Sequence, residues 1–180
     1  MRAIPRTLEL LVADFDITAL ILSEHDAFRR AFTELEGQSD AEALRAGWQE
    51  LVDQLEVHAA GEEQVFYPHL LKDVSDSEDD TEHAVKDHNE IRDAVRSVGE
   101  HEVGSDSWWE AFRSAREVTV EHLEEEENDV LPPFKDEVDE AKRTELGMAW
   151  LAFHEEHERA RGLSGDDVDP QAYVEEHTSG

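Results

Sequence analysis

The feature that most constrains the fold of this chain is an internal repeat of polar residues. The first half contains HAAGEEQVFYPHL and the second half contains HLEEEENDVLPPF. Aligning the two segments pairs the following residues: His58 with His122, Glu62 with Glu126, Glu63 with Glu127, and Pro68 with Pro132. A further His precedes each segment, His25 by 33 residues and His88 by 34. Each half therefore offers one His and one His-x-x-x-Glu pair, which predicts two similar halves.

Apolar residues recur at helical spacing over four long stretches. We expect these helices over about residues 16–36, from Asp40 to Pro68, from the acidic loop 75–80 to Gly99, and from Ser105 or Ser107 to just before Pro132. A fifth amphipathic helix is expected over about residues 139–161, and no stretch has a convincing strand pattern. Prolines and glycines mark the ends of these stretches.

Short loops within each half predict two antiparallel helical hairpins. The expected fold class is therefore all-α: an antiparallel up-down-up-down four-helix bundle with an additional C-terminal helix. We assign the bundle to residues 14–136 and the accessory amphipathic helix to residues 137–161. Residues 162–180 form an acidic tail that we expect to be loosely attached or disordered.

The repeated His and Glu positions favour a metal site. Residues four apart lie on one helix face, and both His-x-x-x-Glu pairs continue apolar stripes that face the core. The pair alone is weak, because His154 and Glu158 form one too. The same pair also stands at the same distance before a Pro in both halves, and each half has a further inward-facing His. This combination is harder to obtain by chance.

The candidate ligands are four His and two Glu: His25, His58, Glu62, His88, His122 and Glu126. Two buried carboxylates without partners would cost several kcal/mol each. Two divalent cations would compensate them, with the Glu residues bridging and the imidazoles terminal. Nitrogen and oxygen ligands of this kind suit iron better than calcium or magnesium.

Composition excludes several classes of function. Asp and Glu number 47 against 16 Lys and Arg, a net charge of −31, and the Lys residues are only Lys72, Lys86, Lys135 and Lys142. Such a chain is not expected to bind nucleic acid or an anionic membrane. It has no Cys, no membrane-spanning run and no signal-peptide pattern, so we expect a cytoplasmic protein. The acidic, Lys-poor surface leads to the hypothesis of a halophilic source, since concentrated salt screens self-repulsion.

Taken together, these motifs resemble the hemerythrin-like, HHE cation-binding family over roughly residues 14–136. The motifs that carry the resemblance are Glu24-His25, His58-x-x-x-Glu62-Glu63 before Phe66-Tyr67-Pro68, Asp87-His88, and His122-x-x-x-Glu126-Glu127 before Leu131-Pro132. The resemblance implies an antiparallel four-helix bundle around an oxo- or hydroxo-bridged, non-haem di-iron centre. It implies the same six residues as ligands.

One position departs from the oxygen-carrying hemerythrins, which place two ligating His one turn apart on the third helix. Here Ala84 lies four residues before His88 and Arg92 four residues after it. His83 is not expected to be a ligand, because five residues correspond to about 140° around a helix. His154 and His157 of the fifth helix could support the ligands from behind, but we expect them to be surface or cap residues. His69, His101 and His177 are expected in solvent. The aromatic residues Trp48, Phe66, Phe112 and Trp150 are expected in the core.

The sequence leaves two functions open. The first is a binding or sensing protein for dioxygen, another diatomic or iron status; the second is a di-iron enzyme for peroxidase-like detoxification or iron-centre repair. We favour binding or sensing, partly because iron-repair relatives carry a Cys-bearing N-terminal segment. A ferritin-like oxidase is disfavoured, since no Glu stands three residues before any His. No protein partner can be identified from the sequence.

Overall fold

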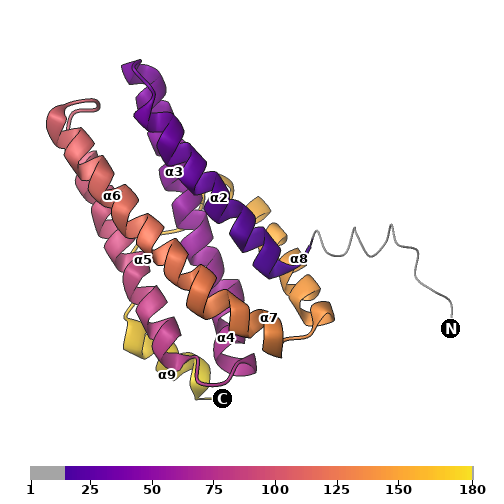
Figure 1. The fold of residues 1–180 in the computed structure, drawn as a ribbon. Coiled ribbons are helices and arrows are strands. Elements are labelled where there is room, and N and C mark those ends of the chain that lie inside the picture. The colour runs from indigo at the N-terminus through magenta and orange to yellow at the C-terminus, as the bar shows by residue number, and fades with distance from the viewer. Residues whose placement is uncertain (1–14, 180) are drawn as a thin grey trace, which may run out of the picture.

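The computed structural model describes residues 15–179, and these residues form a helical bundle with no strand among them. The predicted all-α class is thus confirmed for this part of the chain. Two predictions concern residues outside this range. They are the start of the bundle at residue 14 and most of the N-terminal segment in which we found no signal-peptide pattern. Gly180 also lies outside the described residues. Four long helices run along the bundle (Figure 1): α2 (Ile17–Glu36), α3 (Ala41–Gly61), α5 (Glu78–Gly99) and α6 (Asp106–Glu125).

Three of the long helices begin at a side-chain cap. The Asp16 carboxylate accepts a hydrogen bond from the Thr18 amide at the start of α2, and Asp40 caps α3 in the same way through Ala43. Ser105, one of the two residues that the sequence offered, caps α6. These caps satisfy amide groups that a helix cannot pair internally, and each is typically worth about 1 kcal/mol.

The apolar core has two large clusters and a small third one that contains Val57, Ala60 and Phe153. One large cluster contains Ile17 and Ile21 of α2, and the other contains Phe28 and Phe32 of the same helix. His25 lies between them and is fully buried. The aromatic residues expected in the core are all buried there: Trp48, Phe66, Phe112 and Trp150.

Both prolines of the repeat lie within continuing helix, so the prediction that the second and fourth helices end at Pro68 and before Pro132 is wrong. α3 passes through a π-helical turn, η1 (Glu62–Phe66), into α4 (Tyr67–Asp73). α6 passes through the equivalent turn, η2 (Glu126–Val130), into α7 (Leu131–Glu137). Each proline therefore lies in the first turn of a new helical segment, where its missing N–H is tolerated.

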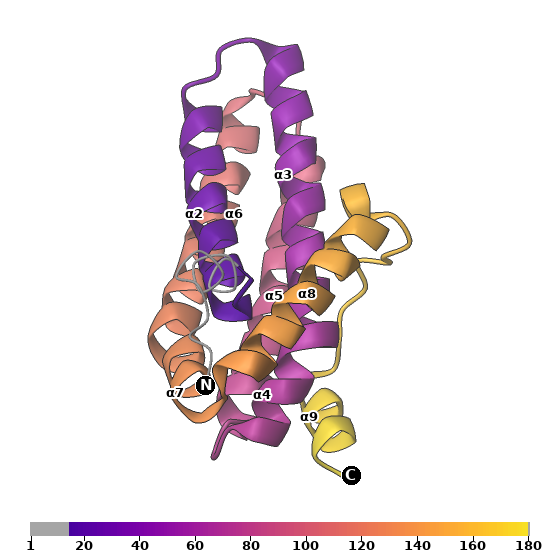
Figure 2. The same cartoon turned by 90° about the vertical axis from the view of Figure 1, so that its right-hand side faces the viewer.

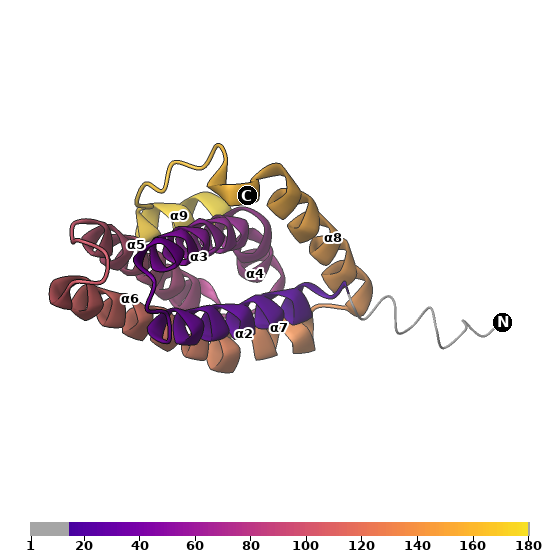
Figure 3. The same cartoon turned by 90° about the horizontal axis from the view of Figure 1, so that it is seen from above.

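The fifth predicted helix is α8 (Glu140–Glu156), followed by a short 3₁₀ turn, η3 (Glu158–Ala160). It packs against α2 and α3 on one side of the bundle (Figures 2 and 3). Glycines permit this approach. A Cβ atom at Gly147 would lie 1.7 Å from the Phe15 carbonyl oxygen, and one at Gly61 would lie 3.0 Å from the Trp150 ring.

The acidic tail contains a helix, α9 (Pro170–Thr178), that packs against α5 and α4 (Figure 2). The expectation of a loosely attached or disordered tail is wrong for this segment. Its Tyr173 side chain is buried in the cluster that contains Ile17 and Ile21, and Asn89 of α5 bonds the backbone of Val168 in both directions. One buried aromatic residue in an acidic stretch is a weak sequence signal, which explains the error.

Within the described part of the chain, no helix combines the length and the apolar character needed to span a membrane.

Candidate metal centre

The six candidate ligands meet in the buried layer between the two apolar clusters. They come from the four long helices and both π turns: His25 from α2, His58 from α3, Glu62 from η1, His88 from α5, His122 from α6 and Glu126 from η2. None is more than 3% exposed. The i,i+4 geometry that the sequence predicts is present, since His58 Nε2 lies 3.2 Å from Glu62 Oε1 and His122 Nε2 lies 3.6 Å from Glu126 Oε2.

The donor atoms form two groups, each compact enough to hold one metal ion. The first comprises His25, His58, Glu62 and Glu126, and the second comprises Glu62, His88 and His122. Glu62 belongs to both. Its Oε1 lies 3.2 Å from His58 Nε2, and its Oε2 lies 3.1 Å from His88 Nε2. A carboxylate with one oxygen in each group has the geometry of a bridging ligand.

Two buried oxygen atoms in this layer have no hydrogen-bond partner among the described residues: Glu62 Oε1 and Glu126 Oε2. A buried carboxylate oxygen without a partner is costly. Glu62 Oε1 lies 3.2 Å from His58 Nε2, and Glu126 Oε2 lies 3.4 Å from His25 Nε2 and 3.6 Å from His122 Nε2. Carboxylate oxygens beside imidazole nitrogens form a donor set that transition metals favour. The residues present therefore fit a pair of metal ions better than they fit a purely hydrogen-bonded core.

Each of the four His turns Nε2 toward the centre and Nδ1 toward a carboxylate. The contacts are His25 to Glu127 at 3.0 Å, His58 to Glu24 at 2.8 Å, His88 to Glu63 at 2.9 Å and His122 to Asp87 at 3.6 Å. Carboxylates in this position fix the orientation of metal-binding imidazoles and raise their basicity.

The four orienting carboxylates follow the sequence repeat but cross over between helices. Glu24 precedes His25 in the sequence yet contacts His58, and Asp87 precedes His88 yet contacts His122. The second acid of each Glu-Glu pair likewise reaches the His of another helix. These four residues belong to the repeated motifs, but sequence reasoning gave them no role. Their repetition in both halves was the sequence signal that could have identified them as orienting residues.

The electrostatics of the layer suit a cation. Burial by itself would raise the pKa of Glu24, but hydrogen bonds with His154 and His58 outweigh it and lower that pKa to about 2. Burial by itself would lower the pKa of His88, but its contacts with Glu62 and Glu63 raise that pKa to about 9. The carboxylates thus stay ionised and hold positive charge nearby.

Tyr67 is a further residue at the centre that sequence reasoning did not single out. Its hydroxyl donates to Glu126 Oε1 at 2.7 Å and lies 3.4 Å from His88 Nε2. Burial, followed by the negative charges of Glu126 and Glu62, raises the pKa of Tyr67 well above its usual value. The hydroxyl therefore keeps its proton and donates it in the hydrogen bond to Glu126 Oε1.

The prediction that His154 is a surface or cap residue is wrong. Its Nε2 lies 3.2 Å from Glu24 Oε2, and the Trp150 indole donates to Glu24 Oε1 at 2.8 Å. α8 thus supports the carboxylate that orients His58. Sequence reasoning left this link open because it depends on how α8 crosses the bundle.

The remaining His residues lie outside both buried groups. His83 is exposed on α5, His101 lies in the turn before α6, and His157 contacts the Arg161 carbonyl near the end of α8. His69 lies in α4 rather than in a loop and pairs with Asp73. His177 lies in α9, where its Nδ1 is 2.8 Å from the Tyr173 carbonyl oxygen, so it is not simply solvated.

Comparison with known proteins gives one family. The family model described as the hemerythrin HHE cation binding domain matches residues 16–134, about two thirds of the chain. No curated protein and no solved structure matches the chain.

Proposed function

We propose that this chain, which belongs to the hemerythrin HHE cation-binding family, holds two non-haem iron ions and uses them to bind or sense dioxygen, another diatomic or iron status. The observation that carries this proposal is the pair of buried donor groups that share Glu62. In the proposed centre, His25, His58, His88 and His122 are terminal ligands, and Glu62 and Glu126 bridge the ions. An oxo or hydroxo group would complete the proposed centre, within an antiparallel up-down-up-down arrangement of the four long helices.

When bound, two adjacent iron ions would supply the electrons for binding a diatomic. The chain's own residues exclude water and hold the ligands in place, since the donor groups lie between two apolar clusters and have orienting carboxylates behind them. Ala84 leaves space near the centre. It lines a cavity of about 280 Å³ together with His122 and Glu126, which gives a small molecule a path toward the ligands.

A second candidate function is a di-iron enzyme with peroxidase-like activity. The observation that favours it is the Tyr67 hydroxyl, 2.7 Å from Glu126 Oε1 and 3.4 Å from His88 Nε2. If a peroxide were bound at the centre, the Tyr67 hydroxyl would hold a proton beside it.

The first test is metal content. Protein expressed with ample iron should hold about two iron ions per chain. An iron content near zero in well-folded helical protein would refute the proposal.

The second test separates binding from enzymatic turnover. We expect the optical spectrum of the reduced protein to change on exposure to air. The centre has four His ligands, and Ala84 stands where a fifth could be. We therefore expect rapid autoxidation of the iron and poor reversal of the spectral change. Sustained consumption of added peroxide with a reductant would favour the enzyme. Stable oxygenation over many cycles would show that Ala84 matters less than we argue.

A further inference from the structure

A third group of metal-binding side chains lies outside the buried centre. His83 Nε2 of α5 is 3.1 Å from Glu125 Oε2 of α6 and 3.7 Å from Asp87 Oδ2. One atom from each residue lies within 4.8 Å of the others. His83 is exposed and Glu125 is half-buried, so solvent reaches this group directly. We call these three residues the outer triad.

The outer triad lies at a cavity that reaches the buried centre. This cavity, of about 280 Å³, is lined by all three triad residues and also by His122 and Glu126. Glu126 is 1% exposed, and its Oε2 has no hydrogen-bond partner. Glu126, which carries the unpartnered oxygen, thus lines the inner wall of this cavity, and the triad lines its outer wall.

The charge of the cavity favours cations. Besides Glu126, its acidic lining residues are Asp79, Asp80, Asp87, Glu125 and Asp129. Among the described residues, no Lys or Arg lines it. Burial, with the charges of Asp129 and Asp79, raises the pKa of Asp80, as expected where carboxylates are crowded without enough positive charge.

The two halves of the repeat differ at this point. Glu24, which orients His58, is held by Trp150 and His154 of α8. Its counterpart Asp87 has a shorter side chain and lies 3.6 Å from His122 Nδ1, compared with 2.8 Å for Glu24 and His58. Asp87 contacts His83 instead of α8. It therefore connects the outer triad directly to a residue of the buried centre.

We propose that His83, Asp87 and Glu125 form an outer site for a divalent first-row transition metal. This site holds iron(II) before the ion passes through the cavity to His122 and Glu126. One imidazole nitrogen and two carboxylate oxygens match the ligand preference of these metals, and exposure leaves further positions for water. The outer site stands on its own geometry, whereas its loading role rests on the proposed di-iron function.

The first experiment uses zinc as the probe on the iron-loaded full chain. Zinc binding is measured by equilibrium dialysis in about 1 M potassium chloride, where the Debye length of ~3 Å suppresses non-specific attraction. The wild-type protein should bind one zinc ion per chain with its iron content unchanged. His83→Ala and Glu125→Gln should each weaken this binding at least about tenfold. Equal zinc affinity in wild type and both variants would overturn the outer site.

A matched control is available on α4. His69 and Asp73 form an exposed His–carboxylate pair at 3.2 Å, comparable to the His83 pairs but outside this cavity. His69→Ala should leave zinc binding unchanged. If it weakens binding as much as His83→Ala does, the zinc is binding to surface histidines in general and the proposal fails.

The second experiment measures loading. Iron-free protein is mixed with iron(II) without air, and uptake is stopped with a chelator at successive times. His83→Ala and Glu125→Gln should load several-fold more slowly than wild type and His69→Ala, and should reach the same final iron content. Equal rates would overturn the loading role.

The two proposals can fail separately. Zinc at the triad in a chain that never takes up iron would refute the di-iron function and keep the outer site. Two iron ions per chain without triad-dependent zinc binding would refute the outer site and keep the di-iron function.

Discussion

At the scale of single residues, the centre depends on pairs in which a carboxylate holds an imidazole. Glu24 is the most heavily used of these carboxylates, since it contacts His58, His154 and Trp150. A group with three partners from two other helices fixes the position of His58 more firmly than the single contact at 3.6 Å fixes His122. The His58 side should therefore be the more rigid half of the centre.

We predict that Glu24→Gln weakens metal binding about 10- to 100-fold, because an amide cannot supply the charge that orients the His58 imidazole. Competition with a chelator measures the change. Glu50→Gln is the control. Glu50 and Glu24 line one cavity, which is separate from the cavity at the outer triad, and Glu50 is exposed. Equal losses in the two variants would mean that the effect comes from net charge and not from His58.

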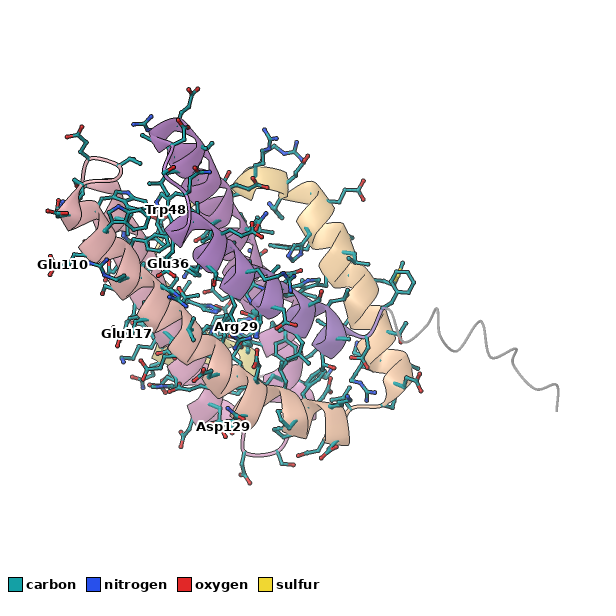
Figure 4. The ribbon with its side chains drawn as sticks, turned by 45° about the horizontal axis from the view of Figure 1, so that its top comes forward. Arg29, Glu36, Trp48, Glu110, Glu117 and Asp129 are labelled. Carbon is teal, nitrogen blue, oxygen red and sulfur yellow. The ribbon has the colours of Figure 1, made fainter. Side chains whose placement is uncertain are left out.

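Glu62→Ala should remove both metal ions, because the two Glu62 oxygens face different donor groups. The measurement is metal content per chain, which should fall from about two to near zero. Glu117→Ala is a control on the outer face of α6 (Figure 4) and should retain both ions. If Glu62→Ala retains one ion, Glu62 is not a bridging ligand.

At the scale of secondary-structure elements, the π turn after α3 explains why α9 is attached. The Tyr67 amide donates to the Glu62 carbonyl, five residues back. The same spacing would pair the Glu63 carbonyl with Pro68, which has no N–H. The Tyr173 hydroxyl of α9 donates to this carbonyl instead. The tail thus completes the backbone bonding of the turn that carries Glu62.

Tyr173→Phe should lower the free energy of unfolding of the metal-loaded protein by about 1–3 kcal/mol, the usual cost of a buried acceptor without a partner. Urea denaturation measures the loss. Gln171→Ala, at an exposed position on the same helix, should cost much less. No difference between these variants would show that water or another group satisfies the Glu63 carbonyl.

The sequence predicted most of the helices because caps and apolar periodicity are local signals. Asp40 and Ser105 could be identified as caps without any tertiary information. The path beyond Pro68 could not be predicted, because a π turn depends on bonds that only the folded chain reveals. The contact between His154 and Glu24 joins residues 130 positions apart, and no period in the sequence encodes it.

At the scale of the whole molecule, a polar layer separates two apolar clusters. Without metal, two carboxylate oxygens in this layer lack hydrogen bonds, so metal binding and folding should be coupled. The metal-loaded form should melt at a higher temperature. A ligand at a hundredfold excess over its Kd adds ~2.7 kcal/mol. Equal melting temperatures with and without metal would remove iron-dependent stability as a sensing mechanism.

We predict that salt stabilises this protein, because its net charge is −31. Repulsion among surface carboxylates weakens as the Debye length falls from ~10 Å at 0.1 M to ~3 Å at 1 M ionic strength. Surface ion pairs such as Arg96 with Asp167 also weaken, but they are worth little individually. Because acids outnumber bases 47 to 16, relief of repulsion should dominate, and the melting temperature should rise with salt.

Thermal melts of the metal-loaded protein in potassium chloride from about 0.1 M to above 1 M measure this effect, with metal content checked at each point. Neutralising exposed acids on the outer face of α6, such as Glu110 and Glu117 (Figure 4), should make the rise shallower, because less repulsion is left to screen. A flat or falling melting temperature would argue against adaptation to high salt. It would leave the metal centre unaffected, since the centre is buried and its charges are paired within a few ångströms, where dissolved ions screen little.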